Sequence, residues 1–283
     1  MDDERRSHET VDVRQDGRRV VITLCRPEIH NAQNETLIDD LFDVTEGLRD
    51  RDDFDAVVLQ SSGDHWCTGL DMKAHREGWR PDRAFAVKWD TAIANLQALG
   101  QIVIGLVDGY CLGGGVQLAM GCDLRIATER AVFAIPASRE VGLLGGMATW
   151  YLPRLLGISR AKALLLGGAV LNARQAAEWG LVEQVVPAGQ LHTALEQVVG
   201  PLSADTLSSV GECKRIINTA AETGFDEAWS NYLEAQSRLM ASPARENRTR
   251  EVLELMTEGK SPYLEVGWFP FDAPQAKGPP WTE

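Results

Sequence analysis

GLVDGYCLGGGVQLAMGCDLRIA, residues 105–127, is the stretch of sequence that decides the fold. An apolar run, residues 102–107, has the composition of a strand and is broken by the turn dipeptide at residues 108–109. Three successive glycines, Gly113 to Gly115, then precede residues 116–120, whose side chains suit a helix. The pattern therefore predicts a strand, a glycine-rich turn and a helix.

This glycine turn has two interpretations. A helix N-terminus presents unpaired N–H groups and the positive end of the helix dipole, and glycines let a ligand approach that backbone. The turn would then meet a negative charge, either a bound phosphate or an oxyanion formed during a reaction. Alternatively, the glycines serve only close packing of the helix on the strand. A nucleotide site is not supported, because GxxxxGK[ST] is absent and the GxGxxG spacing fails at Leu118.

Composition narrows the class of protein. With 283 residues, 44% of them hydrophobic, the chain can form one large domain or two smaller ones with a proper core. Its net charge of −13 argues against a surface for nucleic acid or anionic membranes. The charged N-terminus, MDDERRSHE, does not resemble a signal peptide, and no apolar run reaches the length of about 18 residues that a membrane span needs. We therefore expect a cytoplasmic protein.

The cysteines and histidines give no metal or redox motif. The five cysteines contain no CxxC pair and are odd in number, which favours reduced, buried thiols over disulfides or zinc ligands. The five histidines form no HExxH pattern, and no GxSxG occurs. The sequence thus predicts neither a metal site nor a serine-hydrolase site.

Along the chain, strand and helix patterns first alternate, and helical patterns alone follow them. Strands are predicted at 11–13, 19–24, 56–59, 102–107, 123–127 and 181–186, and helices from Asn34 or Glu35, over 151–166 and over 173–179 with Asn172 as the cap. A turn at Asp16-Gly17 indicates a hairpin. Residues 206–258 are nearly all helical in pattern, so we expect an α/β core on a parallel sheet with a helical C-terminal region.

Four separate motifs resemble the crotonase superfamily, the enoyl-CoA hydratase/isomerase family. They are RPEIHNA (26–32), SSGDHWCTGLDMK (61–73), VDGYCLGGGVQLAMGCDLRIA (107–127), and YLPRLLG (151–157) together with AAEWGLVEQVVP (176–187). The resemblance covers roughly residues 11–258 in order and spacing. It implies a spiral of repeated ββα units over residues 1–200 and a helical region over 201–258 that mediates trimers, often paired into hexamers. Residues 259–283, rich in proline and aromatic residues, are predicted to pack as an extended arm, with a disordered tail as the alternative.

The resemblance also implies a substrate and an oxyanion site. Acyl-CoA thioesters bind in this family with the carbonyl oxygen between two backbone N–H groups, which match Leu70 in CTGLD and Gly114, the middle glycine of the triplet. CoA is part of the substrate, so no separate cofactor is expected. The anion that the turn accommodates would then be an enolate or a tetrahedral oxyanion.

Further residues match the family's CoA-binding segment. The backbone that brackets adenine and pantetheine corresponds to Thr68, Leu70 and Met72, and Lys73 corresponds to a basic position that reaches phosphate. Arg26 and His30 are weaker phosphate candidates, for which a solvated surface position is the alternative. Trp66, Trp79, Trp89 and Trp150 either line an acyl pocket or fill the core.

The sequence departs from the family at both catalytic glutamates of the hydratases. The first glutamate position, three residues beyond the middle glycine, is Gln117, and the second, directly after the proline of an F-x-x-PE pattern, is Ala137. Neither side chain can take a proton near neutral pH. A compensating insertion and deletion would instead align Glu140 with the second glutamate position of the family.

Three functions are consistent with these residues. The first is an enzyme that stabilises an enolate and acts as an isomerase, a lyase or a decarboxylase. The second is a hydratase that uses a displaced Glu140. The third is a catalytically silent paralogue that binds acyl-CoA or serves as a subunit of a complex.

Overall fold

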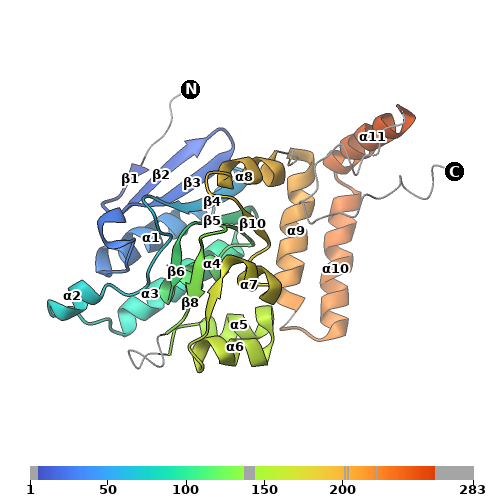
Figure 1. The fold of residues 1–283 in the computed structure, drawn as a ribbon. Helices are drawn as coiled ribbons and strands as arrows, with labels where there is room; N and C mark the ends of the chain where they lie inside the picture. The colour runs from blue at the N-terminus through green and yellow to red at the C-terminus, as the bar shows by residue number, and fades with distance from the viewer. Residues whose placement is uncertain (1–5, 137–143, 201, 203, 221, 259–283) are drawn as a thin grey trace. The chain divides into compact units, whose positions relative to one another are not determined.

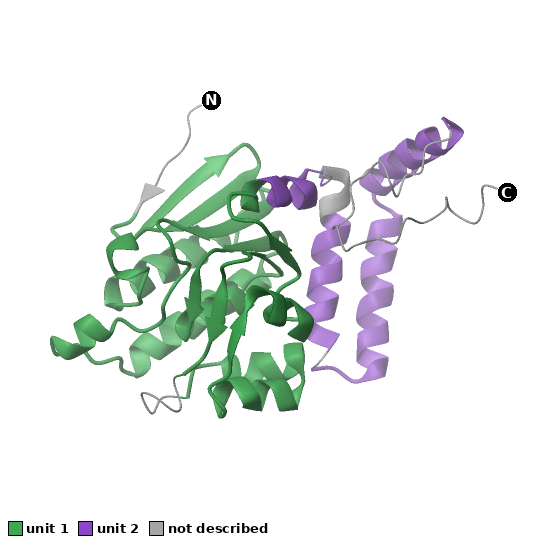
Figure 2. Cartoon of the chain, viewed as in Figure 1, with its two compact units in different colours: residues 1–192 green, residues 193–283 purple. Residues whose placement is uncertain are grey.

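The computed structural model describes residues 6–136, 144–200, 202, 204–220 and 222–258. The chain divides into two compact units, residues 1–192 and 193–283 (Figure 2). The domain boundaries expected after residues 200 and 258 stay predictions. The expected C-terminal arm, residues 259–283, lies outside the described residues.

Within the described residues, a seven-stranded sheet forms the centre of the first unit (Figure 1). Its strands, in spatial order, are β1 Arg6–Ser7, β2 Val11–Asp16, β3 Arg19–Leu24, β4 Ala56–Ser61, β5 Ile102–Val107, β7 Leu124–Thr128 and β10 Gln184–Val186. The β2–β3 pair is the predicted antiparallel hairpin, and β3, β4, β5, β7 and β10 run parallel. The prediction of a parallel-sheet core is confirmed.

A smaller sheet and a set of helices complete this unit. The described part of the smaller sheet has β6 Tyr110–Leu112 paired parallel to β8 Val132–Ala134, which pairs antiparallel to β9 Val170–Asn172. The helical elements are η1 Pro27–Ile29, α1 Glu35–Leu48, α2 Met72–Arg76, α3 Arg83–Ala98, α4 Gly114–Met120, α5 Ala148–Leu156, α6 Ile158–Leu165 and α7 Ala173–Trp179. Helices α1 and α3 pack side by side (Figure 1).

Capping side chains set where two predicted helices begin. The Asn34 side chain accepts a hydrogen bond from the Leu37 N–H at 3.0 Å and starts α1, whose apolar stripe is buried. Asn172 and Gln175 form a capping box that starts α7. Both helix starts are confirmed.

The single helix predicted over residues 151–166 is in fact two helices. Gly157 separates α5 from α6 and has a φ of +81°, a left-handed conformation that cannot continue a right-handed helix. The pattern of apolar residues runs through both helices, and for this reason it did not reveal the break.

Beyond the sheet, the chain is helical, as predicted. The boundary between the two units in the sequence, after residue 192, falls within helix α8, Leu191–Val199. The second unit contains α9 Ala204–Ala220, α10 Phe225–Met240 and α11 Pro243–Thr257. No described helix is long and apolar enough to cross a bilayer.

Candidate functional site

The glycine turn leads directly into α4, as predicted. Gly113, with a φ of +52°, is the N-cap residue, and its own N–H donates to the Ala134 carbonyl at 2.8 Å. Gly114 is the first helical residue, so its N–H has no acceptor within the helix. No other acceptor for this N–H occurs in the described ranges. The turn therefore presents an open N–H donor at a helix N-terminus.

A second open donor lies at Leu70. Gln33 pairs with Leu70 as in a parallel sheet: the Gln33 N–H donates to the Gly69 carbonyl at 2.7 Å, and the Asp71 N–H donates to the Gln33 carbonyl at 2.9 Å. In this pairing the N–H of Leu70 itself points away from Gln33. Among the residues that the structure describes, it meets no acceptor.

The two donors are held close by backbone packing. A Cβ atom added to Gly69, whose φ is +80°, would lie 3.1 Å from the Gly114 nitrogen and 2.9 Å from the Leu112 oxygen. One added to Gly115 would lie 2.2 Å from the Cys67 oxygen. Close packing therefore accounts for Gly69 and Gly115, while Gly114 leaves a donor open, and the interpretation that this donor meets a negative charge stays a prediction.

Sequence reasoning missed Gln33, a buried amide beside this turn. A Cβ atom on Gly114 would lie 2.1 Å from Gln33 Oε1, and Gln33 Nε2 lies 3.5 Å from Cys67 Sγ. The only signal in the sequence is that Gln33 directly follows RPEIHNA. A side chain at position 114 would therefore force the Gln33 amide to move.

Gln117, the predicted counterpart of the first glutamate, is buried one turn along α4. The Trp89 indole N–H donates to Gln117 Oε1 at 3.0 Å. Because an indole nitrogen can only donate, this bond fixes the amide with its oxygen toward Trp89 and its NH₂ group away. That NH₂ group has no acceptor in the part of the chain that is described. Of the four tryptophans considered above, Trp89 contacts a predicted site residue, whereas Trp66 is wholly buried with its indole N–H on the Gly115 carbonyl.

Asp90, which the sequence analysis did not consider, lies next to Gln117. Its carboxylate accepts a hydrogen bond from the Met147 N–H at 3.4 Å and is partly buried. Burial raises the pKa of Asp90 above its ordinary value, and the single hydrogen bond only partly offsets this. Its sequence signal is weak, because nothing but the neighbouring Trp89 distinguishes it from a solvated helix charge.

Two predicted catalytic residues cannot be placed. Ala137 and Glu140 lie outside the described residues, so the choice between them as the second glutamate position stays a prediction.

The predicted CoA segment surrounds the start of α2. The Asp71 side chain caps this helix by accepting from the Lys73 and Ala74 N–H groups at 3.0 and 2.9 Å. Burial raises the pKa of Asp71, but these hydrogen bonds and the Arg26 guanidinium outweigh it and leave the pKa below its ordinary value. Lys73 and Met72 are exposed, and within the described ranges no acid pairs with Lys73.

Arg26 has a clear structural role. Its guanidinium donates to the Ala32 carbonyl and to Asp71 Oδ2, the latter at 3.1 Å, and its side chain is only 14% exposed. It is therefore not a solvated surface charge, and a phosphate-binding role for it stays a prediction. Thr68 contacts the His30 carbonyl through both its N–H and its hydroxyl group.

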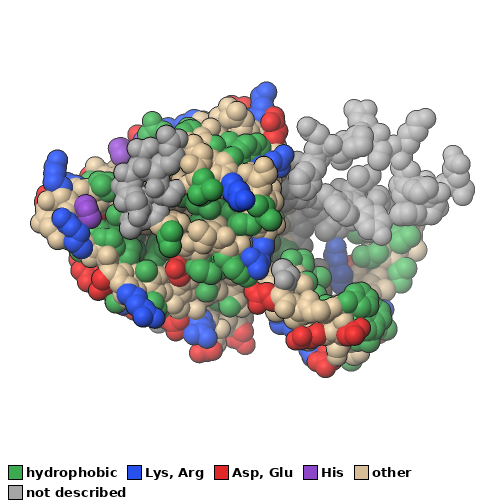
Figure 3. Space-filling view, turned by 90° about the horizontal axis from the view of Figure 1, so that it is seen from below, with side chains coloured by type: hydrophobic (Ala, Val, Ile, Leu, Met, Phe, Trp, Pro, Cys, Tyr) green, Lys and Arg blue, Asp and Glu red, His purple; other side chains and the backbone are tan. Residues whose placement is uncertain are grey.

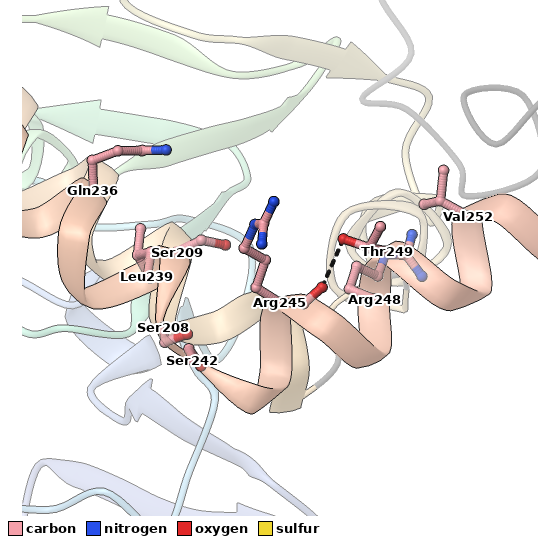
Figure 4. A pocket seen from close by; sticks show the side chains of 9 residues that line it. All are labelled: Ser208, Ser209, Gln236, Leu239, Ser242, Arg245, Arg248, Thr249 and Val252. Carbon is pink, nitrogen blue, oxygen red and sulfur yellow. Dashed lines mark hydrogen bonds between the residues drawn. The ribbon is translucent and has the colours of Figure 1, made fainter.

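A separate groove of about 360 Å³ lies within the second unit, between α9, α10 and α11 (Figure 4). Its lining contains hydroxyl groups and the guanidinium groups of Arg245 and Arg248, and the Thr249 hydroxyl donates to the Arg245 carbonyl. Arg248 also pairs with Glu251 at 2.7 Å. No carboxylate lines this groove in the described residues.

Comparisons with known proteins agree on one family. The sequence profile described as enoyl-CoA hydratase/isomerase matches residues 17–273. A protein of Mycobacterium bovis named probable enoyl-CoA hydratase is 33% identical over 222 residues, covering 78% of this chain and 86% of that protein. A 1,2-epoxyphenylacetyl-CoA isomerase of Escherichia coli is 32% identical over 215 residues, covering 73% of this chain and 81% of that protein.

Solved structures show the same fold. An enoyl-CoA hydratase from Bacillus anthracis matches with a TM-score of 0.79 at 26% identity, covering 90% of this chain and 98% of that one. An enoyl-CoA hydratase from Mycobacterium smegmatis matches with a TM-score of 0.79 at 28% identity, covering 89% of this chain and 98% of that one. The predicted crotonase-like α/β fold is confirmed.

Proposed function

The chain belongs to the enoyl-CoA hydratase/isomerase family, and from that premise we propose that it binds an acyl-CoA thioester and stabilises its enolate, acting as an isomerase, a lyase or a decarboxylase. The observation that carries the proposal is the pair of open backbone donors at Leu70 and Gly114 beside an amide, Gln117, in place of an acid.

The two donors would meet the thioester oxygen. As a proton or a carboxyl group leaves the α carbon, negative charge moves to this oxygen, and donors aimed at it stabilise the transition state more than the substrate. One such donor is worth about 3 to 4 kcal/mol. Both donors are backbone groups at glycine-rich turns, so no side chain has to move to complete the site.

Gln117 supports a reaction other than hydration. Addition of water to an enoyl thioester needs a base for the water and an acid for the α carbon, each contributing about 10² to 10⁴-fold. A carboxamide supplies neither. With its oxygen held by Trp89, Gln117 can offer its NH₂ group to a polar substituent of the acyl chain.

Hydration is the second candidate. It is favoured by the name of the Mycobacterium bovis relative, a probable enoyl-CoA hydratase, and it would require Glu140 as the displaced acid–base residue. A catalytically silent paralogue is less well supported, since close packing explains a glycine at position 115 but leaves the open Gly114 donor without a use.

Binding of CoA would involve residues 68–73. Lys73 is an exposed cation near the start of α2 and is suited to bind a phosphate. It lies three residues after Leu70, whose N–H is one of the two open donors. A trimer or hexamer is part of the same proposal. In its support, Phe225, Trp229 and Tyr232 form an exposed aromatic row on α10. Figure 3 shows hydrophobic side chains interspersed with charged ones on the face in view.

The test is a panel of CoA thioesters that includes acetyl-, butyryl-, crotonyl- and phenylacetyl-CoA. Each is measured for thermal stabilisation and for turnover, and free CoA serves as the reference. A ligand that binds only the folded state raises the melting temperature by mass action. If no thioester at saturating concentration shifts the melting temperature or gives calorimetric heat, a substrate that is not a CoA thioester becomes the better explanation.

A further inference from the structure

Gly146 packs closely against both Asp90 and Gln117. A Cβ atom added to Gly146 would lie 2.4 Å from Gln117 Oε1 and 3.2 Å from Asp90 Oδ1. Gly146 also has a φ of +56°, which L side chains rarely adopt. Gln117 lies three residues after Gly114 and therefore on the same face of α4. The Asp90 carboxylate thus lies beside the side chain at the first glutamate position.

The hydrogen bonding of Asp90 distinguishes it from Asp71 and Asp108. Asp71 accepts from two N–H groups and pairs with Arg26, and Asp108 accepts from Thr128 and Arg130. Asp90 receives a single long hydrogen bond, from the Met147 N–H at 3.4 Å, and no cation pairs with it in the described ranges. A partly buried carboxylate with so few donors has unused capacity to accept a proton or a hydrogen bond.

We propose that Asp90 is a catalytic acid–base residue of this site and exchanges a proton with the acyl group of the bound thioester. The proposal rests on the proposed function above. In the forward step the C–H bond at the α carbon breaks, and its electron pair forms the carbon–carbon double bond of the enolate. The negative charge moves to the oxygen between Leu70 and Gly114, and the proton forms an O–H bond on Asp90.

Return of the proton completes the reaction without any other reactant. Delivered to the same carbon, it regenerates the thioester; delivered to the γ carbon of an unsaturated acyl chain, it gives the double-bond isomer. Burial raises the pKa of Asp90, which brings the group closer to the neutral pH at which an acid–base catalyst works best. Gln117, whose oxygen is already occupied by Trp89, would then orient the substrate and leave proton transfer to Asp90.

The experiment measures exchange of α hydrogens for deuterium. Wild-type protein is incubated in D₂O with acetyl-, butyryl- and phenylacetyl-CoA, and deuterium uptake is followed by mass spectrometry. We expect exchange with at least one thioester and a loss of about 10²-fold or more in Asp90→Asn. Asp90→Glu should recover part of the rate. Asp39→Asn is the matched control. Asp39 lies in α1 and pairs at 2.6 Å with Lys88 of α3, the helix that carries Asp90, and its replacement should leave exchange unchanged.

Thermal shifts with the same thioesters separate the two proposals. Unchanged stabilisation of Asp90→Asn by the thioesters, with exchange lost, supports Asp90 as the proton carrier. Exchange at the wild-type rate in Asp90→Asn overturns it, and so does a wild type that binds thioesters but exchanges no α hydrogen. If wild type binds none of the thioesters, the proposed function fails, and the role of Asp90 fails with it.

Discussion

The indole N–H of Trp89 lies 3.0 Å from Gln117 Oε1 and fixes which end of the amide faces the site. Trp89 is buried in α3, and Gln117 is buried in α4, so neither side chain has room to turn over. A carboxylate oxygen would accept the same hydrogen bond as the amide oxygen. Replacement of Gln117 by glutamate should therefore preserve the packing while it introduces a group that can exchange protons.

Restoring both glutamates should restore hydration. We expect wild type to hydrate crotonyl-CoA poorly and the double substitution Gln117→Glu with Ala137→Glu to raise the rate by about 10²-fold or more, since each added carboxyl supplies an acid or a base. Loss of the enoyl thioester absorbance measures the rate, and Glu140→Gln tests the displaced alternative. Wild-type turnover at ordinary hydratase rates, unaffected by Glu140→Gln, would contradict both the assignment of Ala137 and the loss of hydration chemistry.

A methyl group at Gly69 should disrupt the oxyanion site. In Gly69→Ala the new Cβ atom meets the Leu112 oxygen and the Gly114 nitrogen, in addition to the strain of a φ of +80°. The matched control is Gly189→Ala, which has a φ of +84° but no atom within 4 Å of the added Cβ. Both variants should lose about 1 to 2 kcal/mol of stability from the backbone strain. Only Gly69→Ala should also lose deuterium exchange, and equal exchange in the two variants would argue against an oxyanion site here.

Removing the charge of Asp90 should stabilise the fold at neutral pH. Because burial raises the pKa of Asp90, the folded state binds more protons than the unfolded state between the ordinary value of 3.8 and the raised one. The contribution of this group to stability therefore falls as the pH rises through that window. Asp90→Asn should melt at a higher temperature than wild type at pH 7, and the difference should disappear as the pH falls below 3.8.

Asp108 provides a control, because its contribution to stability should depend on pH in the opposite direction. Burial raises the pKa of Asp108, but the hydrogen bonds from Arg130 and Thr128 outweigh it and hold the pKa below the ordinary value. Its contribution is present above pH 3.8 and is lost as the pH falls below that value. Asp108→Asn should thus be less stable than wild type at pH 7, by about 1 kcal/mol. Melting curves for the two variants with parallel pH dependence would contradict the assigned environments.

The aromatic row on α10 should contribute to assembly. We expect a trimer or hexamer in light scattering, and Trp229→Glu, which places a charge between Phe225 and Tyr232, should shift the protein toward smaller species. His192→Glu, which adds a charge at an exposed position outside α10, serves as the control. A wild type that is monomeric at micromolar concentration would remove the support for an assembly.

Sequence patterns predicted the elements whose signals are local. The hairpin at residues 11–24 follows from β-branched runs around a turn dipeptide, and α1 follows from the apolar spacing after Asn34. The break at Gly157 was missed because glycine also occurs inside helices, and only its positive φ ends this one.

The candidate site residues also divide into those with a local sequence signal and those without one. Gly114 and Gln117 could be predicted because they lie in one continuous motif. Asp90 and Gln33 reach the site through the packing of separate elements, so no spacing in the sequence places them there. Arg26 was predicted to be a phosphate ligand or a solvated charge, whereas its structural role depends on Asp71, which is brought beside it only by the fold.

The two open donors, the N–H groups of Leu70 and Gly114, belong to the main chain, whose path depends on Gly69 and Gly115. A substitution of a nearby side chain can therefore change the reaction without removing either donor. The capacity to hold a negative oxygen is a property of the backbone path, which most side-chain replacements leave intact. The choice of bond to break depends on a few surrounding side chains, such as those at positions 90 and 117. If the proposed function holds, single substitutions at such side chains should change the reaction while the two backbone donors stay in place.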